Sequence, residues 1–346
     1  MSGRYARWRM LRIDGSYGEG GGQILRSSVA LSALTGKDIE IANIRSKRER
    51  CGLAAQHLTA VRGVAELCGA AMEGDEIGST SLKFRPGEVQ GGEYEFNVGT
   101  AGSVTLVLQA CMLACLKADG PVTLTIRGGT NVWMSPPVDH YQNVLLPMLR
   151  EMHVDVELEV LQRGFYPQGG GIVTASLAPP RAVMPLRLEG RGRLEMINGT
   201  SFVQNLPEHI AQRMEHAVRK SLLGERIVTE RRLSSGPSSG AGIYLCAKYE
   251  NTVLGADALG ERGVPAERVG ELAAERMRDE LDGGGTLDVH TADQLLPYMA
   301  MAAGDSSFKV RELTSHLMTQ MWLLPQFLPV DISVDGTAVS VSPNRT

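Results

Sequence analysis

One pattern of elements occurs three times along this chain of 346 residues: a short strand, a tight turn and a helix. The first copy covers residues 9–35, where a glycine turn separates a strand-like stretch from apolar residues at helical spacing. The second copy covers residues 94–118 and the third residues 308–328, followed by two more strand-like stretches. Alternating strands and helices favour an α/β fold, and the recurrence predicts an internal repeat.

The stretch from residue 185 to residue 283 interrupts this repeat. It contains two amphipathic helices, strands at 226–232 and 242–249, and a loop rich in serine and glycine. Proline-rich LAPPRAVMP precedes it and DGGG follows it. We therefore predict two repeat units in residues 1–184, a smaller inserted α/β domain in 185–283, and a third unit in 284–346.

Composition limits the kind of protein this chain is. Charged residues make up 21% and the formal net charge is −4, so any contact with nucleic acid must depend on a local basic cluster. The five cysteines are scattered without zinc-site spacing, and Cys111 and Cys115 are expected to pack in the core. No apolar run approaches the roughly 18 residues of a membrane span, and no secretory segment is evident. We expect a soluble, cytoplasmic protein with no membrane partner.

The loop Gly18–Gln23 is a candidate phosphate site. Its glycines let the backbone approach a ligand, and the helix that follows offers unpaired N–H groups to an anion. The loop matches neither a P-loop nor a dinucleotide fingerprint, so a merely tight turn is the alternative. Glu19 would repel a phosphate unless a divalent cation lay between them, which makes Glu19 a candidate metal ligand.

Basic residues follow this loop. Arg26 lies one turn into the predicted helix, and the segment IRSKRER supplies Arg45, Lys47, Arg48 and Arg50. Guanidinium groups favour bidentate contacts with phosphate. A solvated basic loop is the alternative interpretation.

His316 is a candidate nucleophile. Thr314 and Ser315 are good helix N-caps, which places His316 in the first turn of a helix. The helix dipole there disfavours imidazolium and attracts phosphate, and a neutral imidazole can attack phosphorus to form a phosphoramidate. The residues alone leave a structural or general acid–base role open.

Seven motifs occur in the order in which they occur in one known family: DGSYGEGGGQILRSS, IRSKRERCGLAAQHLTAV, VGTAGSVTLVLQ, GGTNVWMSPP, RGFYPQGGG, TADQLLPYMA and TSHLMTQ. Together they cover nearly the whole chain, which resembles the RNA 3'-terminal phosphate cyclase family. The resemblance implies an α/β fold of three repeated βαβαββ units, with a smaller α/β domain inserted before the third. That organisation agrees with the repeat and the insertion predicted above.

The resemblance also implies an activity: conversion of an RNA 3'-terminal phosphate to a 2',3'-cyclic phosphate at the expense of ATP. His316 would become adenylylated, and AMP would then pass to the RNA before the ring closes, with release of AMP and pyrophosphate. Glu19 would lie near a divalent metal, Mg²⁺ or Mn²⁺. The partner would be an RNA with a 3'-phosphate end.

The resemblance further assigns two groups of binding residues. The RNA phosphate would contact Arg26, Arg45, Arg48 and Gln56. The nucleotide would contact Gln109, Pro136, His290, Thr291, Ala292, Asp293 and Gln294. His290 replaces an adenine-stacking tyrosine of bacterial members, and imidazole stacks over less area. Gln320 replaces an asparagine of the motif.

Two alternatives remain open at this stage. One is a non-catalytic member of the same family that acts as a scaffold in ribosomal RNA processing; such members lack the nucleophilic histidine, so His316 counts against it. The other is an enolpyruvyl-type transferase on a related repeated fold, which would not adenylylate a histidine. The sequence leaves the natural RNA, the oligomeric state, the preferred metal and the role of the insert undetermined.

Overall fold

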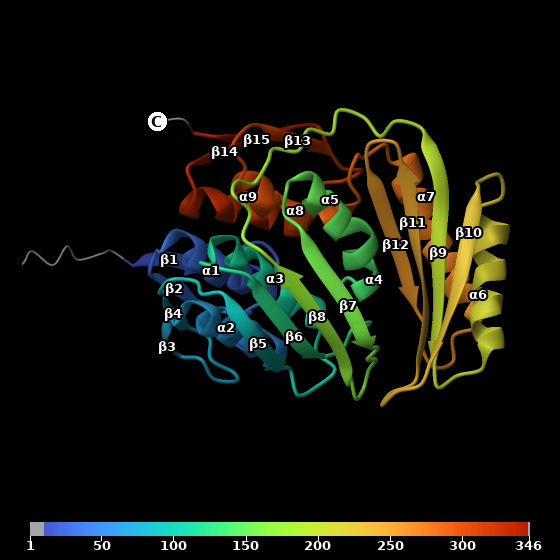
Figure 1. Ribbon diagram of the computed structural model, residues 1–346, viewed down its shortest axis with the longest axis horizontal. Coiled ribbons are helices and arrows are strands. Elements are labelled where there is room, and N and C mark those ends of the chain that lie inside the picture. Colours follow the sequence, from blue (N-terminus) through green and yellow to red (C-terminus); the bar gives the residue numbers. More distant parts are fainter. Residues whose placement is uncertain (1–9, 345–346) are drawn as a thin grey trace, which may run out of the picture.

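The computed structural model describes residues 10–344 and contains three units of similar topology and a fourth unit (Figure 1). The first unit forms a four-stranded sheet of order β1-β2-β4-β3. Strands β1 and β2 are parallel, and β4 is antiparallel to both of its neighbours. Its elements are β1 (Leu11–Asp14), α1 (Gly22–Thr35), β2 (Ile39–Ala42), α2 (Ala55–Cys68), β3 (Ala71–Glu73) and β4 (Leu82–Arg85).

The second unit repeats this plan with the sheet order β5-β6-β8-β7. Strands β5 and β6 are parallel, and β8 pairs antiparallel with β6 and β7. Its elements are β5 (Gly92–Asn97), α3 (Val104–Ala114), the 3-10 turn η1 (Cys115–Lys117), β6 (Val122–Gly128), α4 (Val138–His140), the π-helical η2 (Tyr141–Leu145), α5 (Leu146–Glu151), β7 (Val156–Gln162) and β8 (Gly171–Leu177).

The third unit has the sheet order β13-β15-β14, and residues 186–188 complete it. Arg187 forms a parallel bridge with Ser307, and the Leu188 N–H donates to the Ser307 carbonyl at 2.8 Å. This segment therefore takes the place that β1 and β5 hold in the other units. The remaining elements are α8 (Val289–Ala300), β13 (Ser306–Lys309), α9 (Ser315–Phe327), β14 (Val330–Asp335) and β15 (Ala338–Pro343).

The insert lies between this segment and α8, so it interrupts the third βαβαββ unit after its first strand. Its sheet has the order β10-β9-β11-β12. One face of the sheet packs against α6 and α7, and the other contacts the second unit through an apolar cluster that includes Phe165 and Phe202. The elements are β9 (Leu194–Gln204), α6 (Glu208–Ser221), β10 (Ile227–Ser234), β11 (Gly240–Tyr249), β12 (Val253–Leu259) and α7 (Ala266–Asp282).

The predicted fold class, three α/β repeats with an inserted α/β unit, is confirmed. The domain limits 1–184, 185–283 and 284–346 remain predictions about folding units. The elements absent from the sequence-based assignment include β9, β12 and α8. Asn198 and Gly199 in β9 have the composition of a turn, and Pro297 lies inside α8, so local composition opposed these elements.

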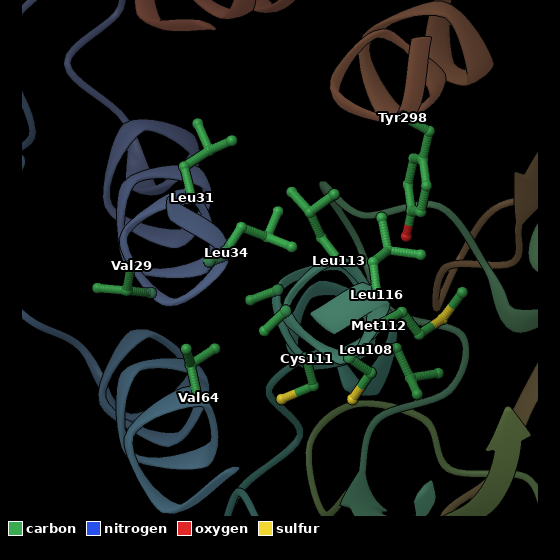
Figure 2. Close-up of a cluster of buried hydrophobic side chains, with 14 of the residues drawn as sticks. Val29, Leu31, Leu34, Val64, Leu108, Cys111, Met112, Leu113, Leu116 and Tyr298 are labelled. Carbon is green, nitrogen blue, oxygen red and sulfur yellow. The ribbon is translucent and has the colours of Figure 1, made fainter. Parts of the chain in front are cut away.

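Helices α1, α2 and α3 pack together over the first two sheets and form the core shown in Figure 2. Leu31 and Leu34 of α1 and Leu108 of α3 belong to this core. Cys111 and Cys115 are fully buried, as predicted, and burial raises the pKa of the Cys115 thiol to about 12. No helix within residues 10–344 is long and apolar enough to cross a bilayer.

Leu108 provides a test of this core. Its side chain is 0% exposed, so Leu108→Ala should lower the free energy of unfolding by about 2–5 kcal/mol, through lost burial and a cavity. Val228→Ala on β10 is the control, because Val228 is 51% exposed. Chemical denaturation of both variants measures the difference, and equal losses would contradict the packing described here.

Candidate active site

A cleft opens where the loop between β1 and α1 meets the first turn of α9. It is lined by Tyr17, Glu19, Gly20, Gly21, Gln23, Ile24, His316 and Thr319. Helix α1 begins after Gly21, which offers no side-chain cap to the first N–H groups of the helix. Uncapped N–H groups at a helix start can accept an anionic ligand, so the phosphate site predicted here stays a prediction.

His316 and Glu19 face each other in this cleft. Nε2 of His316 lies 3.2 Å from Oε2 of Glu19, and the Ser315 hydroxyl donates to the other carboxylate oxygen. Arg48 donates to Oε2 at 3.2 Å. The Ser315 hydrogen bond, helped by His316 and Arg48, holds the pKa of Glu19 below its ordinary value, so the carboxylate is anionic at neutral pH.

The start of α9 positions His316. The Thr314 side chain accepts from the Leu317 N–H at 3.1 Å, which makes Thr314 the N-cap and His316 the second helical residue. Its side chain is 49% exposed, so it is accessible from the cleft. Nδ1 of His316 lies 3.8 Å from Oδ2 of Asp293, slightly longer than a hydrogen bond.

Asp293, on the second turn of α8, connects the cleft to the interior. Its Oδ2 accepts a hydrogen bond of 2.7 Å from Gln23 at the start of α1. Burial raises the pKa of Asp293 to about 7, and the positive charge of Arg26 opposes this rise only in part. The carboxyl group beside His316 therefore changes its charge near neutral pH.

The glycine loop is held against α9 by close packing. Gly18 has φ +56°, and a Cβ there would lie 2.7 Å from the Thr319 hydroxyl, so only glycine fits without rearrangement. The Lys47 amine donates to the Gly18 carbonyl at 2.8 Å. Tyr17 stacks on Trp322 of α9, with ring centroids 3.9 Å apart and planes at 8°. These contacts fix Glu19 opposite His316.

A second, internal cavity lies between α1, α3, α8 and α9. Its polar lining includes Arg26, Gln109, Gln294 and Gln320. Within the described part of the chain, Arg26 Nε, Gln294 Oε1 and Gln320 Oε1 are buried without a hydrogen-bond partner. Leaving such groups unpaired costs about 1–3 kcal/mol each, so this cavity is suited to polar ligand atoms or water.

Arg26 is the charged group of this cavity. It is 6% exposed, and no carboxylate lies within ion-pair distance of it among residues 10–344. Burial lowers its pKa to about 10, which still leaves it cationic at neutral pH. Arg26 thus lines the same cavity as Gln109 and Gln294, two predicted nucleotide-binding residues. Its guanidinium also reaches the glycine loop, because a Cβ at Gly22 would lie 3.0 Å from Nη1 of Arg26.

The remaining predicted phosphate-binding residues lie at the entrance to α2. Arg45 donates to the Gly52 carbonyl of its own loop at 2.8 Å, and Gln56 accepts from the Ser103 N–H at 3.2 Å. Ser103 in turn hydrogen-bonds Thr105, which donates to the Pro136 carbonyl. Helix α2, which follows the basic loop, therefore connects through the start of α3 to the segment that carries Pro136.

The start of α8 carries the other predicted nucleotide-binding residues. His290 is exposed, whereas Thr291 and Ala292 are fully buried, so these two side chains do not reach the surface. The Thr291 hydroxyl donates to Asp288 at 2.8 Å and lies 3.0 Å from Nε2 of His140. Burial lowers the pKa of His140, which favours the neutral ring.

Asp288 joins α8 to the insert. Its carboxylate caps the helix by accepting from the N–H groups of His290 and Thr291, and it also accepts from the Gly255 N–H of β12 at 3.0 Å. Because His140 follows Pro136 in sequence, the His140–Thr291 contact connects the two segments that carry Pro136 and His290. The insert therefore supports the start of α8 directly.

Three site residues were not identified from sequence: Tyr17, Gln23 as a partner of Asp293, and Ser315 as a partner of Glu19. Ser315 was expected to be an N-cap, but its hydroxyl contacts a residue 296 positions away. No local sequence pattern predicts a hydrogen bond between two residues so far apart in the chain.

The described residues contain no group of three or more His, Cys, Asp or Glu side chains arranged to hold a metal ion. Glu19 is a single anionic carboxylate in a glycine loop that leads into the uncapped start of α1. That arrangement fits Mg²⁺ or Mn²⁺ bound by one carboxylate, substrate phosphate oxygens and water.

A family model and several known proteins that resemble this chain all carry the same family name. A sequence model described as "RTC: RNA 3'-terminal phosphate cyclase" matches residues 17–334. The RNA 3'-terminal phosphate cyclase of Methanopyrus kandleri is 49% identical, covering 94% of this chain and 96% of that protein. The protein of the same name from Nitrosospira multiformis is 47% identical, covering 95% and 94%. That from Archaeoglobus fulgidus is 44% identical, covering 96% and 100%.

Among solved structures, the chain matches the enolpyruvyl transferase NikO from Streptomyces tendae at 12% sequence identity. The match covers 96% of this chain and 81% of the NikO chain. Its TM-score of 0.28 is too low to support an argument about fold or function.

The raised pKa of Asp293 generates a prediction. Because burial disfavours the carboxylate, the stability that Asp293 contributes is present below its ordinary pKa of 3.8 and is lost as the pH rises through about 7. In Asp293→Asn the amide can still accept from Gln23 but does not ionise. The free energy of unfolding of Asp293→Asn should therefore increase relative to that of wild type as the pH rises from about 4 to 7. If the difference in free energy of unfolding between the two proteins did not change with pH, Asp293 would ionise at its ordinary pKa.

Proposed function

The chain belongs to the RNA 3'-terminal phosphate cyclase family, and on that premise we propose that it uses ATP to convert an RNA 3'-terminal phosphate to a 2',3'-cyclic phosphate. The family match extends over residues 17–334. The structural observation that supports the proposal most is His316, an accessible histidine whose Nε2 lies 3.2 Å from the anionic Glu19 of the glycine loop.

In the proposed first step, Nε2 of His316 attacks the α-phosphorus of ATP. A P–N bond forms, the bond to the pyrophosphate oxygen breaks, and pyrophosphate leaves. Asp293 lies beside Nδ1, where it would orient the ring and stabilise the positive charge that develops on it. Glu19 would hold the divalent cation, which when bound offsets the negative charge of the phosphates.

The nucleotide would occupy the region between Pro136 and His290. Adenine would lie between these side chains, because both are accessible and a buried hydrogen bond connects their segments. Arg26, Gln109 and Gln294 would contact the nucleotide from the internal cavity. Thr291 and Ala292 would act by holding the first turn of α8 in place.

The second step transfers AMP from His316 to the RNA 3'-phosphate, and in the third the neighbouring 2'-hydroxyl attacks this phosphate and expels AMP. Arg48, Arg45 and Gln56 would hold the RNA phosphate. Attachment of AMP converts an inert phosphate into one with a good leaving group. Proximity of the 2'-hydroxyl supplies much of the remaining acceleration.

Neither alternative function is favoured. A non-catalytic scaffold would not require an accessible histidine beside a phosphate-binding loop, and the similarity to an enolpyruvyl transferase carries no weight. A cytoplasmic location remains a prediction.

The nucleophile can be tested by labelling. Purified protein incubated with ATP labelled at the α-phosphate and Mg²⁺ or Mn²⁺ should acquire acid-labile AMP, because a phosphoramidate forms at His316. His316→Ala should acquire none. His209→Ala, which removes an exposed histidine of α6, should label as wild type does. Equal labelling of the His316 variant would exclude His316 as the nucleophile.

The two arginine positions make a second test. Arg48→Ala should reduce cyclisation more than self-adenylylation, because a lost charge-assisted hydrogen bond costs about 1.5–3 kcal/mol and Arg48 would hold only the RNA. Arg26→Ala should reduce both reactions, since Arg26 shares a cavity with Gln109 and Gln294. Arg50→Ala serves as the exposed control within the same loop. If Arg26→Ala self-adenylylates as wild type does, Arg26 contacts the RNA phosphate and not the nucleotide.

A further inference from the structure

We propose that Tyr17, supported by Trp322, is a stacking platform for the 3'-terminal nucleobase of the RNA. This subsite deepens the proposed function and rests on it. The ligand class is an unpaired nucleobase at the end of a single strand, recognised by its flat face rather than by its hydrogen-bonding edge.

Tyr17 is placed for such a role. It precedes the glycine loop and lines the same cleft as Glu19 and His316, so a group stacked on it would lie beside the reacting atoms. The residue is 40% exposed although one face of its ring is covered by Trp322 at 3.9 Å. Trp322 is itself partly buried and packs against the main core, which makes the platform rigid.

The two ring nitrogens of His316 indicate which ligand lies on which side. Nδ1 faces Asp293 on α8, the helix whose first turn carries the proposed nucleotide residue His290. Nε2 faces Glu19 on the glycine loop. With the adenosine of AMP on the α8 side, the RNA end must approach phosphorus from the side of the glycine loop, where Tyr17 lies.

Positive charge lies on that same side. Lys47 donates to the Gly18 carbonyl and Arg48 to Glu19, so the basic loop lies directly over the glycine loop. A terminal phosphate held by these cations would place its nucleoside within reach of the Tyr17 ring. Bases at single-stranded RNA ends are commonly recognised by stacking on aromatic side chains, and stacking tolerates any base.

The test compares two RNA oligonucleotides with a 3'-phosphate, one with a normal terminal nucleoside and one whose terminal nucleoside lacks its base but keeps the 2'-hydroxyl. Wild type should show a KM about tenfold lower for the normal RNA, a factor that corresponds to about 1.4 kcal/mol. Tyr17→Ala should lose this discrimination, and Tyr17→Phe should keep it. The effect of Tyr17→Ala on the KM for normal RNA should exceed its effect on self-adenylylation by about the same tenfold factor.

Each outcome decides the proposal. Equal KM values for both RNAs in wild type would overturn it without any variant. Discrimination that persists in Tyr17→Ala would also overturn it, as would a parallel loss of self-adenylylation and RNA binding, because Tyr17 would then only hold the glycine loop. Tyr17→Leu replaces the alanine variant if that variant does not fold. Failure of the proposed function would be recognised separately, as absence of cyclisation in wild type.

Discussion

The candidate site depends on one contact, between the glycine loop of the first unit and the first turn of α9 in the third. Glu19 accepts a hydrogen bond from the Ser315 hydroxyl and faces His316. At Gly18 the loop that carries Glu19 packs tightly against Thr319. This contact forms only when the two outer repeats pack together, because α1 and α9 lie side by side. The fold therefore brings the proposed nucleophile and an anionic carboxylate together from opposite ends of the chain.

Burial of charge beside this contact has a cost that a ligand would offset. Arg26 is buried without an ion-pair partner among the described residues, and Asp293 is buried with a pKa raised to about 7. Apolar packing of α1 and α3 compensates for such local losses, since burial of each large apolar side chain contributes about 1.5–3 kcal/mol. A ligand that paired with such buried groups would meet charges that are already oriented, and this arrangement favours electrostatic catalysis.

The insert contributes to the same frame. Its strand β12 donates a backbone N–H to Asp288, the N-cap of α8, while His140 of the second unit contacts Thr291. A second buried contact, the ion pair of Arg163 with Asp139, lies at the same boundary, with Arg163 over the Phe202 ring of the insert. The start of α8 is thus supported by the second unit and by the insert, the part of the chain to which the sequence assigned no role.

The sequence by itself determined the elements whose signals are local. Apolar spacing and caps predicted α1 and α9, and the recurrence of strand, turn and helix predicted the repeats. The motifs indicated the family and made His316 and Glu19 candidate site residues. Only the tertiary structure decided that residues 186–188 complete the third sheet, that Arg26 shares a cavity with Gln294, and that Tyr17 stacks on Trp322. The physical reason is range: caps and periodicity act over a few residues, whereas these pairings join segments far apart in sequence, whose meeting depends on how whole sheets and helices pack.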